Sequence, residues 1–298
     1  MIYIIQGPTA SGKTELAIAL AERLRTDIIS ADSRQFYKEL SIGTAKPNLE
    51  ELDRVKHHFI GNRSITNPMN VAEYETEATA VANDLIKQKG IVVLVGGSAQ
   101  FVDALIFGND NIPVFPEIKL ELNQQLAQKG IESLTQTLKQ LDPQAHQRID
   151  IKNTRRVIRA LEVRLGTGVS ILDYQTVNHA PKFSFKRIVI ELDRKTLYDR
   201  INMRVDKMLS MGLEKEAQNL INCRHLSALN TVGYKEWWDY FDKTTSYDSV
   251  VNNIKQHSRN YAKRQVTWLR KYADAIKVNP LIELNLEGLI DHIISRKR

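Results

Sequence analysis

Residues 7–14 have the types and spacing of a phosphate-binding loop, G-x-x-x-x-G-K-[ST]. Backbone N–H groups in such a loop, and the N-terminus of the helix that follows, point toward one anion. Lys13 adds a positive charge, and the Thr14 hydroxyl can bind Mg²⁺. The loop therefore predicts a polyphosphate site, without indicating which reaction the polyphosphate undergoes. Its residues are Gly7, Pro8, Thr9, Ala10, Ser11, Gly12, Lys13 and Thr14.

The segments around this loop alternate in the way that such a loop requires. Residues 2–5 are apolar and predict a strand over 2–6, and residues 14–25 have the alanine- and leucine-rich pattern of a helix. Alternating strands and helices predict an α/β fold, with a P-loop NTPase-like parallel sheet flanked by helices. Further strands are expected at residues 27–30, 58–60, 91–95 and 187–192, and a further helix at 71–89.

The middle of the chain differs from this pattern. Strand signals stop after about residue 112, and helices are expected at residues 118–129, 131–140 and 154–165. We therefore expect a core domain, residues 1–112 and 183–298, that includes the C-terminal helices. A helical insertion domain is expected at residues 113–182.

Two polar segments follow predicted strands and are expected close to the loop. Asp32 comes just after strand 27–30, and ligands of such sheets bind beyond the carboxyl ends of the strands. A carboxylate there can accept a proton or bind a metal; the alternative is a helix N-cap. Strand 91–95 runs into Gly96 and Gly97, which either let a ligand approach the backbone or form a tight turn. A phosphate-loop hydrolase usually has an acid here, so its absence argues against ATP hydrolysis.

Basic residues are clustered in two predicted helices. The formal net charge is +7, and residues 252–273 contain no acid. In the helix expected at 254–272, Tyr261, Gln265 and Trp268 are expected to pack in the core. The basic face either is solvated or follows a nucleic-acid backbone, and the lack of acids favours nucleic acid. Its six cations are Lys255, Arg259, Lys263, Arg264, Arg270 and Lys271. The second cluster includes Arg155 and Arg159, on a helix whose buried side is expected to carry Ile158, Leu161 and Leu165.

Composition excludes several classes of protein. The 298 residues include one cysteine, Cys223, so no internal disulfide is possible, which fits a reducing compartment. A phosphate loop that begins at Gly7 leaves no room for a signal peptide, and no apolar run is long enough to span a bilayer. We expect a soluble cytoplasmic protein that needs no membrane. The predicted domain organisation is compatible with a monomer.

The order and spacing of the motifs resemble the tRNA dimethylallyltransferases, also called tRNA isopentenyltransferases, over nearly the whole chain. Each motif alone is short, but their joint order is specific to that family. Beyond the loop, the resemblance rests on residues 32–35 (DSRQ), 42–47 (IGTAKP), 57–60 (HHFI), 95–97 (VGG), 155–163 (RRVIRALEV), 197–201 (LYDRI), 232–236 (VGYKE) and 259–265 (RNYAKRQ).

The resemblance implies a reaction. A dimethylallyl group passes from dimethylallyl diphosphate to N6 of adenosine 37 of a tRNA, and diphosphate leaves. Mg²⁺ is the implied cofactor, with Thr14 as a ligand, and no ATP is consumed. The loop amides, Lys13 and Arg200 would stabilise the leaving diphosphate, with Arg204 as a second candidate for this clamp. By resemblance, Asp32 is the general base and Ser98 orients the amino group of the acceptor.

The resemblance also implies contacts with the anticodon stem-loop of the tRNA, whose target base must leave its stack to react. Lys255, Arg259 and Lys263 of the basic helix are expected to add contacts to the RNA backbone. The other contacts are expected at Asp32, Ser33, Arg34, Gln35, Arg155, Arg156, Arg159, Gly233, Tyr234 and Lys235.

Three other functions stay open on the sequence. An adenylate isopentenyltransferase would use the same donor with a free nucleotide, but would have no need of a long cationic face. A P-loop small-molecule kinase would need ATP and an acceptor hydroxyl. A nucleic-acid-binding switch would use the loop as a sensor, and the missing acid after residues 91–95 disfavours switching driven by hydrolysis.

Overall fold

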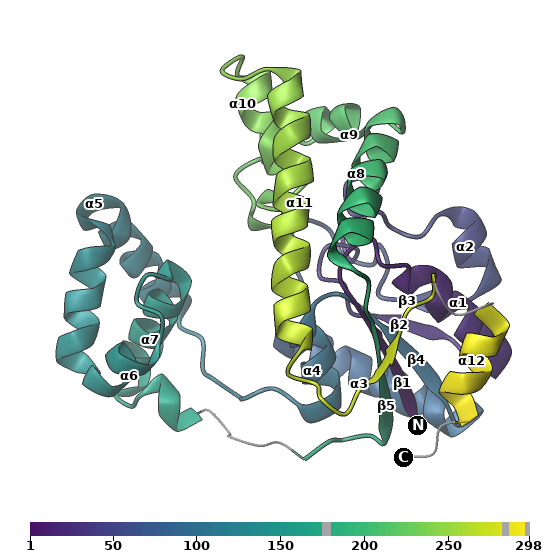
Figure 1. Cartoon of the computed structure of the whole chain (residues 1–298). Helices are drawn as coiled ribbons and strands as arrows, with labels where there is room; N and C mark the ends of the chain where they lie inside the picture. The colour runs from purple at the N-terminus through teal and green to yellow at the C-terminus, as the bar shows by residue number, and fades with distance from the viewer. Residues whose placement is uncertain (175–179, 282–285, 296–298) are drawn as a thin grey trace. The chain divides into compact units, whose positions relative to one another are not determined.

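The computed structural model describes residues 1–174, 180–281 and 286–295 of the chain (Figure 1). The chain forms two compact units by internal contacts, one of residues 1–107 with 181–298 and one of residues 108–180. The sequence predicts the insertion at 113–182, within a few residues of the second unit at each end. Each unit has its own hydrophobic core, and each is described by itself below.

Within the described residues, the first unit contains a six-stranded sheet in the order β3-β2-β4-β1-β5-β6, with every pair parallel. This confirms the predicted parallel α/β fold. The sequence did not predict β6, which is only three residues long and has a single buried position. The strands are β1 (Ile2–Gln6), β2 (Ile28–Ser30), β3 (His57–His58), β4 (Val92–Val95), β5 (Phe185–Ile190) and β6 (Ile276–Val278).

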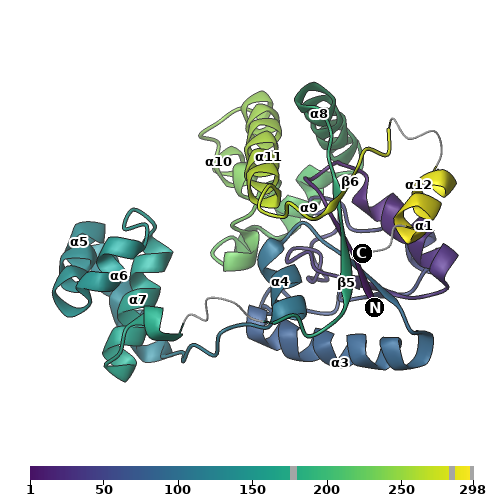
Figure 2. The ribbon, with the colours of Figure 1, turned by 60° about the horizontal axis from the view of Figure 1, so that its bottom comes forward.

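Helices cover both faces of this sheet (Figure 2). Side chains of α3 (Val71–Lys89) and α4 (Ala99–Phe107) pack on one face. Those of α1 (Lys13–Leu24) and α12 (Leu286–Ser295) pack on the other. Two shorter helices, α2 (Leu49–Arg54) and α9 (Leu213–Asn219), lie in the same unit. No helix among the described residues has the length and apolar character needed to cross a membrane.

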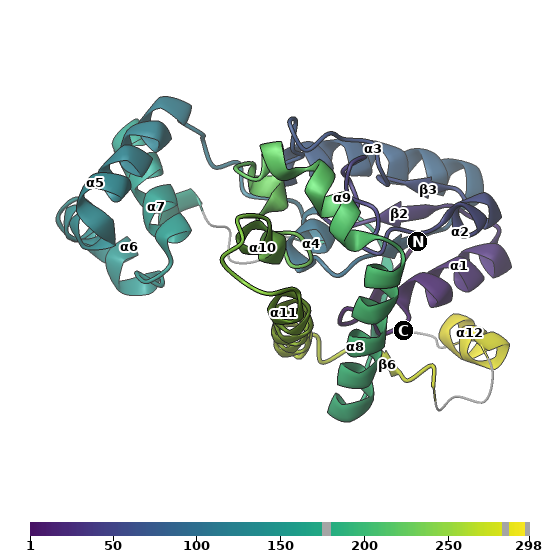
Figure 3. The ribbon, with the colours of Figure 1, turned by 90° about the horizontal axis from the view of Figure 1, so that it is seen from above.

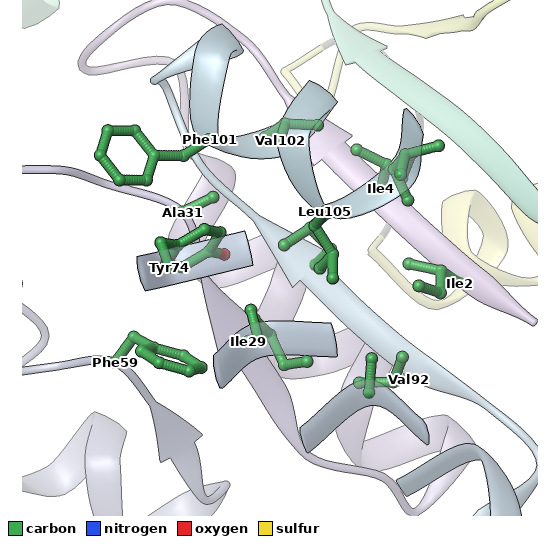
Figure 4. Packing of buried hydrophobic residues seen from close by; sticks show 14 of the residues in the cluster. Ile2, Ile4, Ile29, Ala31, Phe59, Tyr74, Val92, Phe101, Val102 and Leu105 are labelled. Atoms are coloured by element: carbon green, nitrogen blue, oxygen red, sulfur yellow. The ribbon is translucent and has the colours of Figure 1, made fainter. Parts of the chain in front are cut away.

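Alternation along β1 explains how one strand serves both layers. Ile2 and Ile4 belong to the core under α3 and α4, whereas Tyr3 and Ile5 belong to the core under α1 and α12. Figure 4 shows the first of these cores, where Tyr74 of α3 packs against Phe101 of α4. A strand that is buried on both faces reads as a continuous apolar run, which is why β1 was predictable.

The C-terminal helices form a third core beside the sheet. The helices α8 (Arg194–Ser210) and α11 (Tyr247–Leu269) lie side by side (Figure 3) and contact each other along their length. The C-terminal half of α8 and the N-terminal half of α11 pack in one core with Trp237, which is fully buried next to α10 (Trp238–Phe241). This pair of helices is anchored at one end by its own core, so its other residues can be held rigidly over the strand ends.

The second unit is helical. Its helices are α5 (Pro116–Leu141), α6 (Pro143–Arg148) and α7 (Thr154–Thr167). Gly130, with φ 75° and ψ 177°, breaks α5 where the sequence predicts the end of one helix and the start of the next. Leu165 was expected on the buried side of α7 but is 49% exposed, which corrects that assignment. Ile158 and Leu161 are buried as expected.

Candidate active site

The phosphate loop connects β1 to α1, as the sequence predicts. Gly12 begins α1 with φ 96°, a backbone conformation that favours glycine. Gly7 is required for a different reason, because a Cβ there would lie 2.7 Å from the Ser11 hydroxyl oxygen. Ser11 is buried, and its hydroxyl has no hydrogen-bond partner among the described residues. The loop is therefore tightly packed on the protein side.

Three side chains hold the tip of the loop: Lys13 of the loop itself, and Arg200 and Gln265 from α8 and α11. Lys13 Nζ donates to the Pro8 carbonyl at 2.7 Å, and Arg200 Nε donates to the Ala10 carbonyl at 2.8 Å. The Thr9 N–H donates to Gln265 Oε1 at 2.8 Å. These bonds fix Ala10, which has a positive φ of 63°. Arg200 thus contacts the loop, as the resemblance implies, but its contact is with a backbone carbonyl oxygen of the loop.

Lys13, Arg204 and Asp32 share one electrostatic environment. Burial lowers the pKa of Lys13 to about 8, with a further decrease from the nearby positive charge of Arg204 and an opposing increase from Asp32. Burial also lowers the pKa of Arg204, and Asp32 again opposes that change. Two cations and one carboxylate therefore converge at the carboxyl ends of β1 and β2. Two half-buried cations that only one carboxylate offsets form a site suited to a multiply charged anion.

The lowered pKa of Lys13 predicts a pH dependence. If the charged ammonium binds the anionic donor, kcat/KM for the donor falls as pH rises through about 8, since Lys13 then loses its proton. Arginine stays charged over this range, so Lys13→Arg is expected to be less active near neutrality but to lose the alkaline decline. A pH–rate profile of both proteins measures this, and an alkaline decline of equal size in the arginine variant would assign it to another group.

Asp32 follows β2 directly and faces the same space. Its Oδ1 accepts the Arg34 N–H at 3.0 Å, in a turn rather than at a helix. The next helix, α2, begins only at Leu49, so the alternative of a helix N-cap is wrong. The other carboxylate oxygen, Oδ2, takes no part in the hydrogen bond of this turn. Asp32 can therefore act as a base while its backbone contact holds it in place.

The two glycines after β4, Gly96 and Gly97, lie in close contact with other protein atoms. A Cβ on Gly96 would lie 2.4 Å from the Ala31 carbonyl oxygen, and one on Gly97 would lie 2.5 Å from Gln265 Nε2. Neither position therefore tolerates a side chain without movement of its neighbours. Ser98 follows at the start of α4, is half-buried, and makes no hydrogen bond through its hydroxyl within the described residues. That hydroxyl is free for a substrate.

The sequence failed to place Tyr261 and Gln265 of α11 in the site. Both were expected in the core, but Tyr261 is 38% exposed and its phenol lies close enough to Asp32 for the two to interact electrostatically. Burial of the phenol and the charge of Asp32 raise its pKa to about 12, against the opposing effects of Arg34 and Arg264. Helical periodicity puts these residues on the inward face correctly. Periodicity alone could not indicate that part of this face borders the candidate active site and is not packed in the hydrophobic core.

Part of the predicted cationic face of α11 is neutralised by α8. Lys255 forms an ion pair with Asp206 at 2.6 Å, and Arg259 donates to Asn202 Oδ1 at 2.7 Å. Both side chains therefore have partners on α8, which the sequence did not indicate because those partners lie on a different helix; their contact with RNA stays a prediction. Lys263 and Arg264 are exposed and have no such partner among the described residues.

Two of the three tRNA contacts expected at 233–235 are buried. Tyr234 is 0% exposed and donates its hydroxyl proton to Glu216 at 2.6 Å; Gly233 donates its N–H to Glu236 at 2.9 Å. Glu216 also accepts the backbone N–H groups of residues 41–43. A side chain without exposed surface has no face for RNA, so Tyr234 supports the 41–43 segment instead, and only Lys235 of the three is exposed.

The supporting role of Tyr234 predicts a loss of stability. Tyr234→Phe removes the donor from a half-buried carboxylate and is expected to lower the free energy of unfolding by about 1–2 kcal/mol, measured by urea titration. Tyr247→Phe is the matched control, because Tyr247 is a partly exposed tyrosine of the same region whose hydroxyl makes no hydrogen bond among the described residues. A normal unfolding free energy with weakened tRNA binding would restore Tyr234 as a contact residue.

The remaining predicted contacts differ in exposure. In the first unit, Arg34 donates to the Ala228 carbonyl and Gln35 to the carbonyls of Thr44 and Ala45. In the second unit, Arg155 and Arg156 are exposed at the start of α7. Arg159 is instead tied down by Glu162 at 2.9 Å and by the Ile112 carbonyl at 2.9 Å. Its guanidinium is therefore mainly committed within its own unit.

Comparison with known proteins identifies the family. The model of the IPP transferase family matches residues 35–272. The chain belongs to the IPP transferase family. The tRNA dimethylallyltransferase of Christiangramia forsetii is 44% identical over 299 residues, covering 99% of this chain and 98% of the relative. That of Cytophaga hutchinsonii is 41% identical over 281 residues, covering 94% and 92%. The family assignment confirms the resemblance drawn from the motifs.

Solved structures agree with this family assignment. The full-length tRNA isopentenylpyrophosphate transferase from Bacillus halodurans has a TM-score of 0.73 and 33% identity, covering 98% of this chain and 95% of that chain. A eukaryotic dimethylallyltransferase acting on tRNA has a TM-score of 0.80 at 23% identity, covering 99% of this chain and 80% of that chain, and so shows the same fold. The likeness to these structures therefore extends over nearly the whole chain.

Proposed function

We propose that this chain transfers the dimethylallyl group of dimethylallyl diphosphate to N6 of adenosine 37 in the anticodon stem-loop of tRNA, releasing diphosphate. Membership of the IPP transferase family makes it a prenyltransferase that modifies tRNA. One observation supports the finer assignment most. A phosphate loop, two cations and the carboxylate of Asp32 converge at one place, with no acid after β4 to position a hydrolytic water.

The donor half of the site stabilises a leaving anion. As the bond between the allylic carbon and the diphosphate oxygen breaks, its electron pair passes to the diphosphate. Loop N–H groups at the start of α1 point toward that charge. Lys13 and Arg204 are the half-buried cations beside it, and partial desolvation makes their charges count more than they would in bulk water.

The acceptor half supplies a base and an orienting hydroxyl. The exocyclic amino group of adenine is a weak nucleophile, since its lone pair is delocalised into the ring. As N6 bonds to the allylic carbon, the Asp32 carboxylate takes one amino proton. The free Ser98 hydroxyl accepts or donates a hydrogen bond at the same amino group. Tyr261 lies on this side, near enough to Asp32 to interact with its charge.

A magnesium ion fits this site with few protein ligands. Mg²⁺ prefers oxygen and commonly keeps waters, using one or two side chains with substrate phosphates. Among the described residues, no group of three or more His, Cys, Asp and Glu could hold a metal. The Thr14 hydroxyl at the start of α1 is half-buried and makes no hydrogen bond there, so it is the ligand we assign. When bound, the ion would neutralise charge on the diphosphate.

Exposed cations supply the RNA-binding surface in this proposal. On the first unit these are Lys235, Lys263 and Arg264, and on the second unit Arg155 and Arg156. Their contacts to phosphates give affinity, whereas the base is selected in the site. That the protein acts as a monomer stays a prediction.

The ion pair of Lys255 predicts unequal roles for two lysines of one helix. Lys263→Ala is expected to weaken tRNA binding and to reduce the slope of log affinity against log salt by about one. Lys255→Ala is expected to change the slope less, because Asp206 already neutralises that ammonium. Filter binding over a range of salt concentrations measures both slopes. Equal reductions in the two variants would contradict the neutralisation of Lys255, and slopes unchanged from the unaltered protein would show that this face of α11 is only solvated.

Labelled donor tests the proposed function. The protein is incubated with radiolabelled dimethylallyl diphosphate, Mg²⁺, and either unmodified tRNA or AMP, and the labelled nucleoside is identified after digestion. Label on N6 of adenosine 37 is the expected result. Label in AMP alone would favour the adenylate isopentenyltransferase. Phosphate transfer from ATP to a small hydroxyl compound, without prenyl transfer, would favour the kinase.

A further inference from the structure

The carboxamide of Gln265 spans two segments that the proposed reaction assigns to different substrates. Its Oε1 accepts the Thr9 N–H of the phosphate loop at 2.8 Å, and its Nε2 donates to the Gly97 carbonyl at 3.0 Å. Gln265 is 8% exposed. Both polar ends are therefore used, and no solvent is needed to satisfy them.

Both partners of Gln265 are places where the backbone has little freedom. Thr9 precedes Ala10, whose positive φ is held by Arg200 on its other side. Gly97 lies so close to the carboxamide that any Cβ would meet Nε2 at 2.5 Å. The absence of a side chain at Gly97 is thus explained by the approach of α11. The two hydrogen bonds of Gln265 therefore help to fix the backbone of both segments.

The two segments carry opposite halves of the reaction. Thr9 belongs to the loop that we assign to the leaving diphosphate, and Gly97 immediately precedes Ser98, the hydroxyl assigned to the acceptor amino group. A single planar amide between them fixes their separation. Attack at carbon is sensitive to such a separation, because a misplacement of about 1 Å can cost on the order of a hundredfold in rate.

We infer that Gln265 is a positioning residue that joins the donor loop to the acceptor turn and so sets the alignment of the two substrates. The inference rests on the proposed function. It predicts that loss of the amide lowers kcat while the affinity for tRNA is kept. It also predicts that the loop binds a bare diphosphate less well once Thr9 is released.

Two substitutions test this role. Gln265→Glu has nearly the same shape and keeps an acceptor for Thr9, but it has no N–H for the Gly97 carbonyl. Gln265→Met removes both bonds. Each is expected to lower kcat by about 10- to 100-fold, with KM for tRNA within about twofold of the unaltered protein. Gln256→Met is the control, because Gln256 is exposed on the same helix and makes no hydrogen bond through its side chain among the described residues.

Three readouts separate this role from plain support of the fold. Thermal melting checks that the glutamate variant is folded. Its kcat and its KM for tRNA, measured separately, show whether turnover is lowered while tRNA affinity is kept. Calorimetry with inorganic diphosphate reads the loop without any prenyl chemistry, and about tenfold weaker binding by Gln265→Met is expected. If the unaltered protein failed to transfer the prenyl group, the proposed function would fall, and diphosphate binding would still decide the role of Gln265. A folded Gln265→Glu with normal kcat, a loss confined to KM for tRNA, or unchanged diphosphate binding by Gln265→Met would each overturn the inference.

Discussion

Replacing Asp32 with asparagine lowers turnover on tRNA by about a hundredfold or more, while tRNA binding persists. The reason is specific to a base. Asparagine keeps an oxygen that can accept the Arg34 N–H, so the turn after β2 is preserved. Its amide cannot take the amino proton that must leave as the new C–N bond forms. Single-turnover transfer of labelled prenyl groups, with tRNA binding measured in parallel, gives the two quantities separately.

Asp53→Asn is the control for this experiment, because Asp53 is an exposed carboxylate on α2 away from the loop residues. It is expected to react at the normal rate. The asparagine substitution also removes a negative charge beside Lys13 and Arg204, which by itself strengthens diphosphate binding. A slow reaction with tighter diphosphate binding would therefore identify the base clearly. Near-normal turnover of Asp32→Asn would exclude Asp32 from this role.

Removal of the Lys13 ammonium is the second large effect. Lys13→Met keeps most of the aliphatic side chain but leaves the developing charge of the diphosphate to the loop amides and Arg204. We expect kcat/KM for the donor to fall by about 10²- to 10³-fold, as for other groups that act on transition-state charge. Part of this loss appears in KM for the donor, because the ground-state diphosphate is already an anion. Steady-state kinetics with varied donor and saturating tRNA measure both constants.

Lys207→Met is the control for Lys13, because Lys207 is an exposed lysine of α8 without an ion pair among the described residues. The substitution at Lys13 is not expected to weaken the fold, since the ammonium bonds only to the Pro8 carbonyl within the part of the chain that the structure describes. If Lys13→Met changed KM for tRNA and left KM for the donor unaltered, the loop would not be the donor site.

Much of the fold follows from sequence because its signals are local. The largely apolar strand β1 and the helix at Val71–Lys89 were predicted at their observed bounds. Asn70 caps that helix and pairs reciprocally with Glu73, which gives a sharp start that sequence can reveal. The three-residue β6 gave no comparable signal, since it is held by pairing with β5 rather than by its own pattern.

The site was predictable only where topology alone places a residue. Asp32 and Lys13 both follow strands of one parallel sheet, so their convergence follows from the fold. Gln265 and Lys255 could not be interpreted from sequence, because their partners Thr9 and Asp206 lie on other elements. The periodicity of α11 gave the correct inward face, but the contents of that face depend on tertiary packing.

The central claim is that the phosphate loop holds the leaving diphosphate of a prenyl donor. Counting the products of one reaction tests it most directly. The protein is supplied with doubly labelled dimethylallyl diphosphate, ATP and unmodified tRNA, and the prenyl groups in RNA, the free diphosphate and the ADP are measured together. The account predicts one diphosphate released for each prenyl group on adenosine N6, with ATP left intact. Consumption of ATP in step with product, or diphosphate release without prenylated RNA, would contradict it.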